Sequence, residues 1–248
     1  MHSHKVTNPQ DELKKQAAVY AVRFVEPGMT VGLGTGSTAI HAVREIARRH
    51  AVGELEGIKT FATSADIASV ATHAGLPLLG PQGPVRIDVT IDGADEVDPQ
   101  LNLIKGGGGA LLHEKIVAQA TLREIIVVDE SKMSDRLGSK HVLPVEVFPF
   151  DCESQRAFLE ALGGHPALRM DEVHQPFVTE EGNFIYDCRF GPIADPEELA
   201  AELDTRAGLA AHGLFLGLTD DLIVAGPRGL RHLQRDHVTG KIREVAAI

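Results

Sequence analysis

The sequence predicts an α/β fold: an open parallel sheet, followed by a smaller α/β sandwich of the split βαβ (ferredoxin-like) kind. In the first half, apolar strand-like runs alternate with amphipathic helical runs, which indicates parallel strands joined by crossover helices. Beyond Leu137 the order changes, because helices at 153–162 and after Asp195 are separated by strand-like runs. With 248 residues the chain is long enough for one large domain or two smaller ones.

The first half is expected to start with a helix capped by Asn8, with Pro9 at its first position. A buried strand over 30–33 then leads through a glycine-rich turn into a helix that ends near Arg49. Further strands are expected at 58–62, 85–91 and 124–129, and further helices at 67–73 and 110–121. Apolar and polar residues alternate over 85–91, which is the period of a strand.

The second half is expected to contain strands and turns in a different order: a strand at 142–148, a hairpin with arms at 177–179 and 183–190, a helix that starts at Asp195-Pro196, and a strand at 213–218. One more apolar strand, at 222–225, is a candidate to return to the first sheet. The polar segment after Arg228 is a candidate helix. We therefore expect a catalytic domain over 1–137 with the return of 213–229, an inserted domain over 138–212, and a C-terminal tail over 230–248.

The composition of the chain disfavours several classes of function. The 24 Lys and Arg against 35 Asp and Glu give a net charge of −11, which disfavours nucleic-acid binding because phosphate backbones need a basic surface. No apolar run approaches 18 residues and the start shows no signal peptide, so we expect no membrane contact and a cytoplasmic location. The two cysteines, Cys152 and Cys188, can form one bridge or remain free thiols.

Two turns at the predicted carboxyl ends of strands suit an anionic ligand. The first, GLGTGST at 32–38, offers backbone N–H groups at a helix N-terminus together with the hydroxyls of Thr35, Ser37 and Thr38. Ser37 replaces the third glycine of the dinucleotide fingerprint, so a dinucleotide site is not supported. The second turn, TSAD at 63–66, lies at the same expected edge. A tight structural turn and ordinary helix capping are the alternative interpretations of these motifs.

Charged side chains are expected at the same edge. The motif DGADE at 92–96 places three carboxylates in five residues, which suits a catalytic site, a metal site or a solvated loop. Lys105 precedes four glycines, which suits either close approach to a ligand or a flexible linker. With Glu114 and Lys132, this set suits proton transfer next to a carbonyl in a phosphorylated small molecule, where a carboxylate removes the proton and a cation stabilises the enediolate.

These motifs, in this order, resemble those of type A ribose-5-phosphate isomerases: GLGTGSTA (32–39), TSAD (63–66), DGADEVD (92–98), IKGGGGALLHEKI (104–116) and DESK (129–132). DELKKQAA (11–18), PVEVFPF (144–150) and GLFLGLTDDLIVAG (213–226) extend the resemblance from about Asp11 to Gly229. It implies a Rossmann-like domain with a smaller inserted sandwich, in a homodimer or homotetramer. It also implies interconversion of ribose 5-phosphate and ribulose 5-phosphate in the pentose phosphate pathway, without a metal or redox cofactor.

The resemblance implies roles for single residues. Glu114 matches the general base that moves a proton between C1 and C2, and Asp92 matches the residue for sugar-ring opening. Asp95 and Lys105 match groups that bind sugar hydroxyls and stabilise the enediolate. Other matched positions bind the substrate and its phosphate: Lys14, Thr35, Gly36, Ser37, Thr38, Ser64, Asp66, Gly93, Ala94, Gly106 and Lys132. The chain departs from the family in His113, where arginine is usual, in its fourth glycine, and in its tail from about Leu230.

Other functions compete with this interpretation. A non-catalytic sugar-phosphate sensor would not need both Glu114 and Asp92, and a transcriptional one needs a helix-turn-helix segment and a basic face. Another aldose–ketose isomerase or an amino-sugar phosphate deaminase would share the general-base chemistry, and substrate panels would separate these. A dinucleotide oxidoreductase is the weakest alternative because of Ser37.

Overall fold

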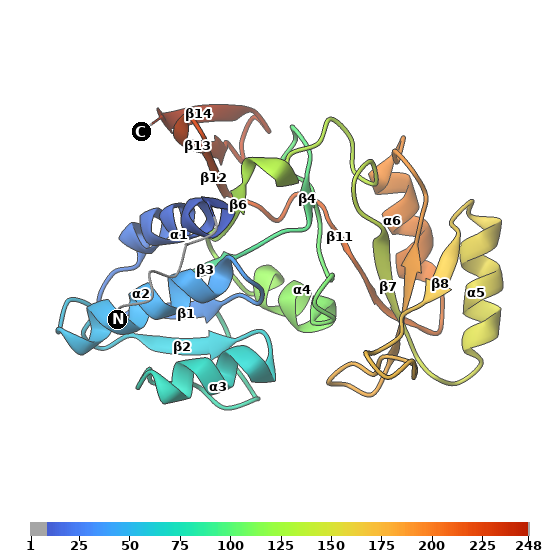
Figure 1. The fold of residues 1–248 in the computed structure, drawn as a ribbon, viewed down its shortest axis with the longest axis horizontal. Helices are drawn as coiled ribbons and strands as arrows, with labels where there is room; N and C mark the ends of the chain where they lie inside the picture. Colours follow the sequence, from blue (N-terminus) through green and yellow to red (C-terminus); the bar gives the residue numbers. More distant parts are fainter. Residues whose placement is uncertain (1–8, 248) are drawn as a thin grey trace, which may run out of the picture.

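The computed structural model describes residues 9–247 and places a large and a smaller sheet at opposite ends of the molecule, with α4 between them (Figure 1). In chain order the elements are α1 (Pro9–Ala21), η1 (Val22–Phe24), β1 (Thr30–Leu33), α2 (Ala39–Ala51), β2 (Lys59–Ala62), α3 (Ala65–His73), β3 (Val89–Asp92), β4 (Glu96–Val97), β5 (Leu103–Ile104), α4 (Leu111–Gln119), β6 (Glu124–Asp129), η2 (Glu130–Lys132), β7 (Leu143–Val147), α5 (Cys152–Ala161), β8 (Pro166–Leu168), β9 (Phe184–Cys188), α6 (Pro196–Thr205), β10 (Leu209–His212), β11 (Leu214–Phe215), β12 (Asp221–Gly226), β13 (Gly229–Arg235) and β14 (Ile242–Ala247). The expected helix cap Asn8 lies outside the described residues. Among the helices of residues 9–247, none is both long and apolar enough to cross a membrane.

The large sheet is open and mostly parallel, as predicted. Its strand order is β14-β13-β12-β6-β3-β1-β2, and the strands from β12 to β2 run parallel. All six residues of β6 are buried, because α1, α2 and α3 cover one face of the sheet while α4 and the short sheet β11-β5-β4 cover the other. The carboxyl ends of β1, β3 and β6 therefore meet at one edge, and the polar turns that follow these strands come together there.

The inserted part is an antiparallel sheet of order β10-β7-β9-β8 with α5 and α6 packed against it. Its chain order of strand, helix, two strands, helix and strand confirms the predicted split βαβ sandwich. The start of α6 follows from its sequence, because the Asp195 side chain accepts a hydrogen bond of 2.9 Å from the Glu198 N–H. We propose that residues 138–212 form a domain of their own, since they supply most of a second core, to which Ile104, Leu137 and Leu214 are added from the flanking segments.

The strand expected over 85–91 is shorter, because β3 begins only at Val89. Val85 is fully exposed, and Ile87 forms an isolated bridge to Thr121 instead of joining the main ladder. The polar residues of β3 are buried like the apolar ones, since both faces of the sheet are covered. The alternation in this segment therefore does not mark a strand with one solvent-facing side.

The prediction of a single strand over 213–218 is also wrong. β10 ends at His212 and pairs with β7, whereas β11 covers only Leu214–Phe215 and pairs with β5. The chain changes sheets at Gly213, where a Cβ atom would lie 2.4 Å from the carbonyl oxygen of Lys105. Glycine is therefore required at this crossing, because any side chain would collide with the backbone that follows β5.

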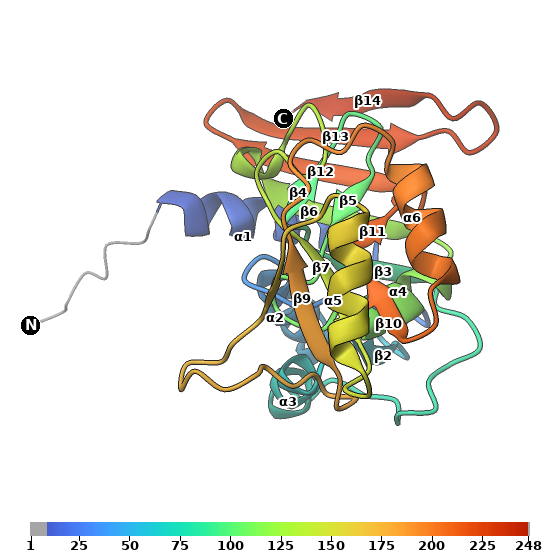
Figure 2. The same cartoon turned by 90° about the vertical axis from the view of Figure 1, so that its right-hand side faces the viewer.

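The C-terminal segment is a hairpin and not a helix. β13 pairs with β12 and β14 pairs with β13, so the segment expected as a tail over 230–248 extends the large sheet by two antiparallel strands (Figure 2, in red). The buried His232 anchors it: its Nε2 lies 2.6 Å from Asp221 Oδ1, and its ring packs edge-on against Tyr20 and Phe24. This contact buries one polar side chain of the segment against the neighbouring strand.

Two further expectations concern the inserted part. The hairpin arm expected at 177–179 is not a strand, because β9 pairs with β7 and β8 instead. A turn does form there, since the Gly182 N–H donates to the Thr179 carbonyl. Cys152 and Cys188 are both free thiols, so the disulfide alternative is wrong.

Candidate active site

A small cavity lies where the turns after β1, β3 and β5 meet the first turn of α4. Its volume is about 110 Å³, and it is lined by Lys14, Thr35, Gly36, Ser37, Thr38, Gly93, Ala94, Asp95, Lys105, Gly106, Gly107, Gly108, Glu114 and Lys132. Larger cavities, of about 800, 850 and 470 Å³, lie elsewhere and gather fewer of the predicted groups. The candidate site is therefore chosen by its chemistry and not by its size.

A buried lysine between two carboxylates forms the centre of this site. Lys105 Nζ lies 3.0 Å from Asp92 Oδ2 and 3.2 Å from Glu114 Oε1, and it donates to the Gly93 carbonyl at 2.5 Å. The exposed fractions are 3% for Lys105, 1% for Asp92 and 6% for Glu114. A Cβ on Gly34 would lie 2.2 Å from Asp92 Oδ1, so glycine at that position allows the two strand ends to pack this closely.

The electrostatics of this trio leave Glu114 suited to exchange a proton near neutral pH. Burial raises the pKa of Glu114 to about 7, since the attraction of Lys105 only partly offsets desolvation and the charge of Asp92 adds to it. Burial also raises the pKa of Asp92, against the pull of Lys105. For Lys105, burial lowers the pKa, but the two carboxylates outweigh it and raise the pKa overall, so the lysine stays charged. Within residues 9–247 no group donates a hydrogen bond to the buried Glu114 Oε2.

The glycine loop after Lys105 is an ordered part of the site and not a linker. The Gly107 N–H donates to Asp95 Oδ2 at 2.8 Å, so the loop packs directly on a carboxylate of the DGADE motif. Gly109 has a φ of +86°, and a Cβ there would lie 2.5 Å from the ring of Phe177. The glycines thus allow close packing of the loop against Asp95 and Phe177, and their close approach to a ligand stays a prediction.

Hydroxyls and lysines form the other part of the site. Lys14 Nζ donates to Ser37 Oγ at 2.9 Å, which brings α1 over the turn that precedes α2. Thr35 Oγ1 lies 2.7 Å from Thr63 Oγ1 and 2.8 Å from Ser64 Oγ, so the two predicted turns are in contact. These groups and the start of α2 can together bind an anion such as a phosphate.

The predicted residues are nearly all in or next to the cavity. Asp92 does not line it but contacts Lys105, and Ser64 contacts Thr35. Asp66 is different, because it is exposed in the first turn of α3 and does not line the cavity. Its role as a substrate contact stays a prediction.

Sequence reasoning missed the contribution of the inserted part. Arg169 Nη1 donates to the carbonyl oxygens of Gly106 and Gly107, and Phe177 packs against Gly109. These contacts join residues more than 60 positions apart, and neither Arg169 nor Phe177 stands in a motif that would mark it. Only the fold brings them to the site.

Known proteins of one family are similar to this chain. The family described as "Ribose 5-phosphate isomerase A (phosphoriboisomerase A)" matches residues 59–229. The chain is 52% identical to the ribose-5-phosphate isomerase A of Desulfatibacillum aliphaticivorans, over 91% of this chain and 98% of that protein. It is 50% identical to that of Chloroflexus aurantiacus, over 92% and 95%. The chain belongs to the ribose 5-phosphate isomerase A family.

Solved structures of ribose-5-phosphate isomerases have the same fold. One, in complex with phospho-erythronic acid, superposes with a TM-score of 0.89 at 37% identity and covers 92% of this chain and 100% of its own. The ribose 5-phosphate isomerase A of Methanocaldococcus jannaschii superposes with a TM-score of 0.86 at 35% identity, over 91% and 100%. The large sheet and the inserted part therefore both belong to the fold of the ribose 5-phosphate isomerase A family.

Proposed function

We propose that this chain interconverts ribose 5-phosphate and ribulose 5-phosphate, a step of the pentose phosphate pathway, by proton transfer through an enediolate at the cavity around Glu114. The observation that carries the mechanism is the buried Lys105 between Asp92 and Glu114, with one Glu114 oxygen free of hydrogen bonds from the described residues. A base with a pKa of about 7 can both take and return a proton near neutral pH. Family membership supports the same reaction.

In the proposed mechanism Asp92 assists ring opening: its carboxylate takes the proton of the O1 hydroxyl as the bond between C1 and the ring oxygen breaks, and it returns that proton to the ring oxygen. Glu114 then takes the proton from C2 of the open aldose, and the electrons move through the new C1–C2 double bond onto O1. Lys105 stabilises the negative charge of this enediolate, and Asp95 binds sugar hydroxyls. Return of the proton from Glu114 to C1, with transfer of the O2 proton to O1, gives the ketose, so atoms and electrons balance.

The phosphate is proposed to bind among the lysines and hydroxyls at the start of α2, where Lys14, Ser37 and Lys132 border the cavity with Thr35 and Thr38. Lys14 and Lys132 supply positive charge locally in a chain whose net charge is −11. Support comes from the solved relative that binds phospho-erythronic acid, since this ligand is also a phosphorylated sugar derivative.

The Thr35 hydroxyl is expected to contribute to binding more than to chemistry. Thr35→Ala should raise KM for ribose 5-phosphate roughly 10- to 100-fold and leave kcat within about threefold, because one hydrogen bond to a charged group is worth about 1.5–3 kcal/mol. Steady-state kinetics would measure both constants. Thr72→Ala is the matched control, since Thr72 is an exposed threonine of α3 whose hydroxyl donates to the Ala68 carbonyl of its own helix. An unchanged KM would count against a phosphate site at this turn.

The pH dependence of turnover is expected to follow Glu114. Because the base must be ionised, kcat at saturating substrate should rise with pH through about 7 and level off above it. A pH profile of kcat would test this, with the residual activity of Glu114→Gln as the control that should lack the inflection. A flat profile between about pH 6 and 9 would contradict the assignment of the base.

The test of the function itself is turnover of ribose 5-phosphate by purified protein in excess chelator, because we also propose that no metal or redox cofactor takes part. Turnover would support the isomerase. Folded protein that binds ribose 5-phosphate without converting it would favour the sensor. Light scattering coupled to size-exclusion chromatography would test the homodimer or homotetramer that we infer from the family resemblance.

A further inference from the structure

Arg169 connects the inserted part of the chain to the glycine loop of the site. It follows β8 directly, and its Nη1 donates to the Gly106 carbonyl at 2.9 Å and to the Gly107 carbonyl at 3.2 Å. The opposite edge of the same guanidinium is occupied by Asp187, at 2.9 Å through Nε and 2.5 Å through Nη2. One planar group thus joins a carboxylate of the inserted sheet to two carbonyls of the loop.

The backbone around Arg169 is itself held in place. The Arg169 N–H donates to the Ile185 carbonyl, and the Phe177 N–H donates to the Arg169 carbonyl. The guanidinium also lies over the ring of Phe177, with its carbon 5.8 Å from the ring centre. Its side chain is only 13% exposed. A guanidinium held on this many sides has a defined direction, and that direction is toward the loop.

The carbonyls that Arg169 binds belong to residues next to the reacting groups. Gly106 follows Lys105 directly, and the N–H of Gly107 donates to Asp95. The peptides of the loop are therefore held on one side by Arg169 and on the other by a carboxylate of the site. Since glycine peptides are the most free to rotate, loss of Arg169 would release this loop more than it would an ordinary one.

We propose that Arg169 is a positioning residue for the isomerisation, which holds the peptides at 106–107 and through them orients Lys105 and Asp95. This proposal rests on the proposed function and deepens it, because the inserted part then supplies a residue on which the site at the large sheet depends. Arg169 does not line the cavity, so it acts through the loop and not on the sugar.

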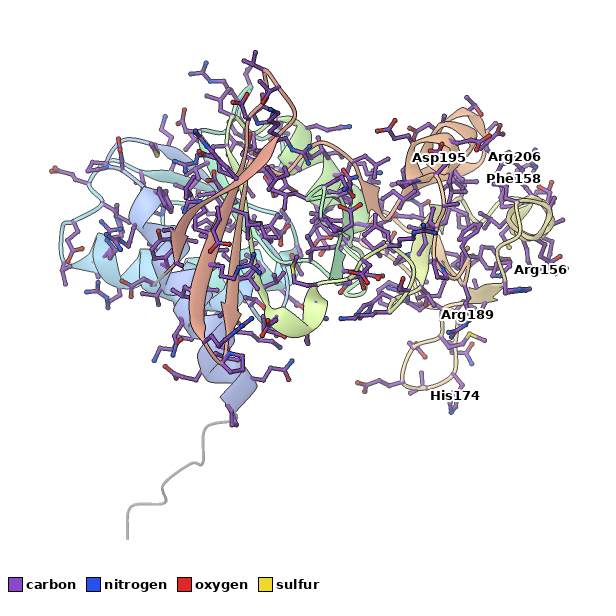
Figure 3. The ribbon with its side chains drawn as sticks, turned by 90° about the horizontal axis from the view of Figure 1, so that it is seen from above. Arg156, Phe158, His174, Arg189, Asp195 and Arg206 are labelled. Carbon is purple, nitrogen blue, oxygen red and sulfur yellow. The ribbon has the colours of Figure 1, made fainter. Side chains whose placement is uncertain are left out.

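The experiment compares Arg169→Ala, Arg169→Lys and Arg206→Ala by kcat, KM and thermal unfolding. Arg206 is the matched control, because it donates to Gln155 and lies over the Phe158 ring at the far end of the inserted part (Figure 3). Arg169→Ala should lower kcat roughly 100-fold, the loss that a displacement of about 1 Å causes, with KM changed less than about threefold. Arg206→Ala should leave kcat within about twofold of the unmodified chain.

Arg169→Lys separates positioning from simple stability. A lysine can keep the ion pair with Asp187, so the midpoint of unfolding should stay near that of the unmodified chain. It cannot also reach both carbonyls, so kcat should remain at least tenfold reduced. Guanidinium chloride, well below unfolding concentrations, should restore part of kcat to Arg169→Ala and none to Arg169→Lys.

Several results would overturn the proposal: unchanged kcat in folded Arg169→Lys, an equal loss of kcat in Arg206→Ala, or a loss confined to KM. If Arg169→Ala does not fold, Arg169→Lys alone decides. Failure of the proposed function would look different, because the unmodified chain would then not convert ribose 5-phosphate at all. The two failures are therefore distinguishable in the same set of assays.

Discussion

Replacing Glu114 by glutamine is expected to lower kcat by roughly 10²–10⁴, the range for loss of a positioned general base. Glutamine has nearly the same shape, and its oxygen can still accept the hydrogen bond that Lys105 Nζ now donates to Oε1 at 3.2 Å. Its amide cannot accept a proton from C2, so substrate binding should persist while chemistry stops. Steady-state kinetics and direct binding of ribose 5-phosphate measure the two effects separately.

Glu124 offers a matched control for this substitution. It is only 2% exposed, and burial raises its pKa well above the ordinary value, as for Glu114. Its Oε2 likewise has no hydrogen-bond partner among residues 9–247, but Glu124 does not line the cavity. Glu124→Gln should therefore keep kcat within about threefold, whereas near-normal turnover by Glu114→Gln would remove Glu114 from the mechanism.

Replacing Lys105 by methionine is expected to harm activity and stability together. The substitution keeps an apolar stem but leaves Asp92 and Glu114 buried without their cation, which typically costs about 3–5 kcal/mol. Without the ammonium, kcat should fall roughly 10²–10³-fold, as when one donor to a developing oxyanion is removed. Both effects have one cause, which is the loss of the only charge shared by these two carboxylates in the described contacts.

The loss of stability in Lys105→Met should depend on pH. Without Lys105 the pKa of both carboxyl groups rises further in the folded state, so the folded chain binds more protons than the unfolded chain. Stability then falls as pH rises, and the difference from the unmodified chain should be larger at pH 8 than at pH 5. Urea unfolding at these two pH values measures it.

Lys115→Met is the control for Lys105→Met. Lys115 lies on α4 and, like Lys105, over the Phe215 ring, but burial lowers its pKa to about 8 and no described carboxylate lies within ion-pair distance of it. Removal of this lysine should leave kcat within about threefold. Full activity of folded Lys105→Met would show that the enediolate needs no cation at this position.

The sequence predicts the local parts of this site because its residues stand in short motifs at strand ends. The sequence predicts strands at 30–33 and 124–129 with the bounds that the structure shows, since both are short apolar runs bounded by polar turns. Convergence of the turns at 32–38, 63–66 and 92–96 follows from the rule that parallel strands end at one edge. Their contacts in the structure agree with it.

What the sequence does not predict depends on contacts between distant segments. Alternating polar residues such as Thr90 and Asp92 suggest a strand with one exposed face. In the structure both residues are buried, because both faces of the sheet at β3 are covered. The hairpin at the C-terminus includes a buried contact between His232 and Asp221 of β12, which no local pattern reveals. Glu180 stands in a predicted turn, yet its side chain accepts a hydrogen bond from the Ala65 N–H at the start of α3, 115 positions away.

The position of β12 after the inserted part also determines when, during synthesis on the ribosome, the large sheet can be completed. β6 and its neighbour β12 are joined only after the whole inserted part has been made, since Glu124 N donates to Asp220 Oδ2 across 96 residues. At roughly 5–20 residues per second, the ribosome needs on the order of 5–20 seconds to span this interval. During that time the edge of β6 that later pairs with β12 has no partner strand. A nascent chain stalled before Asp221 would therefore expose this strand edge, where another chain could pair wrongly or a chaperone could bind.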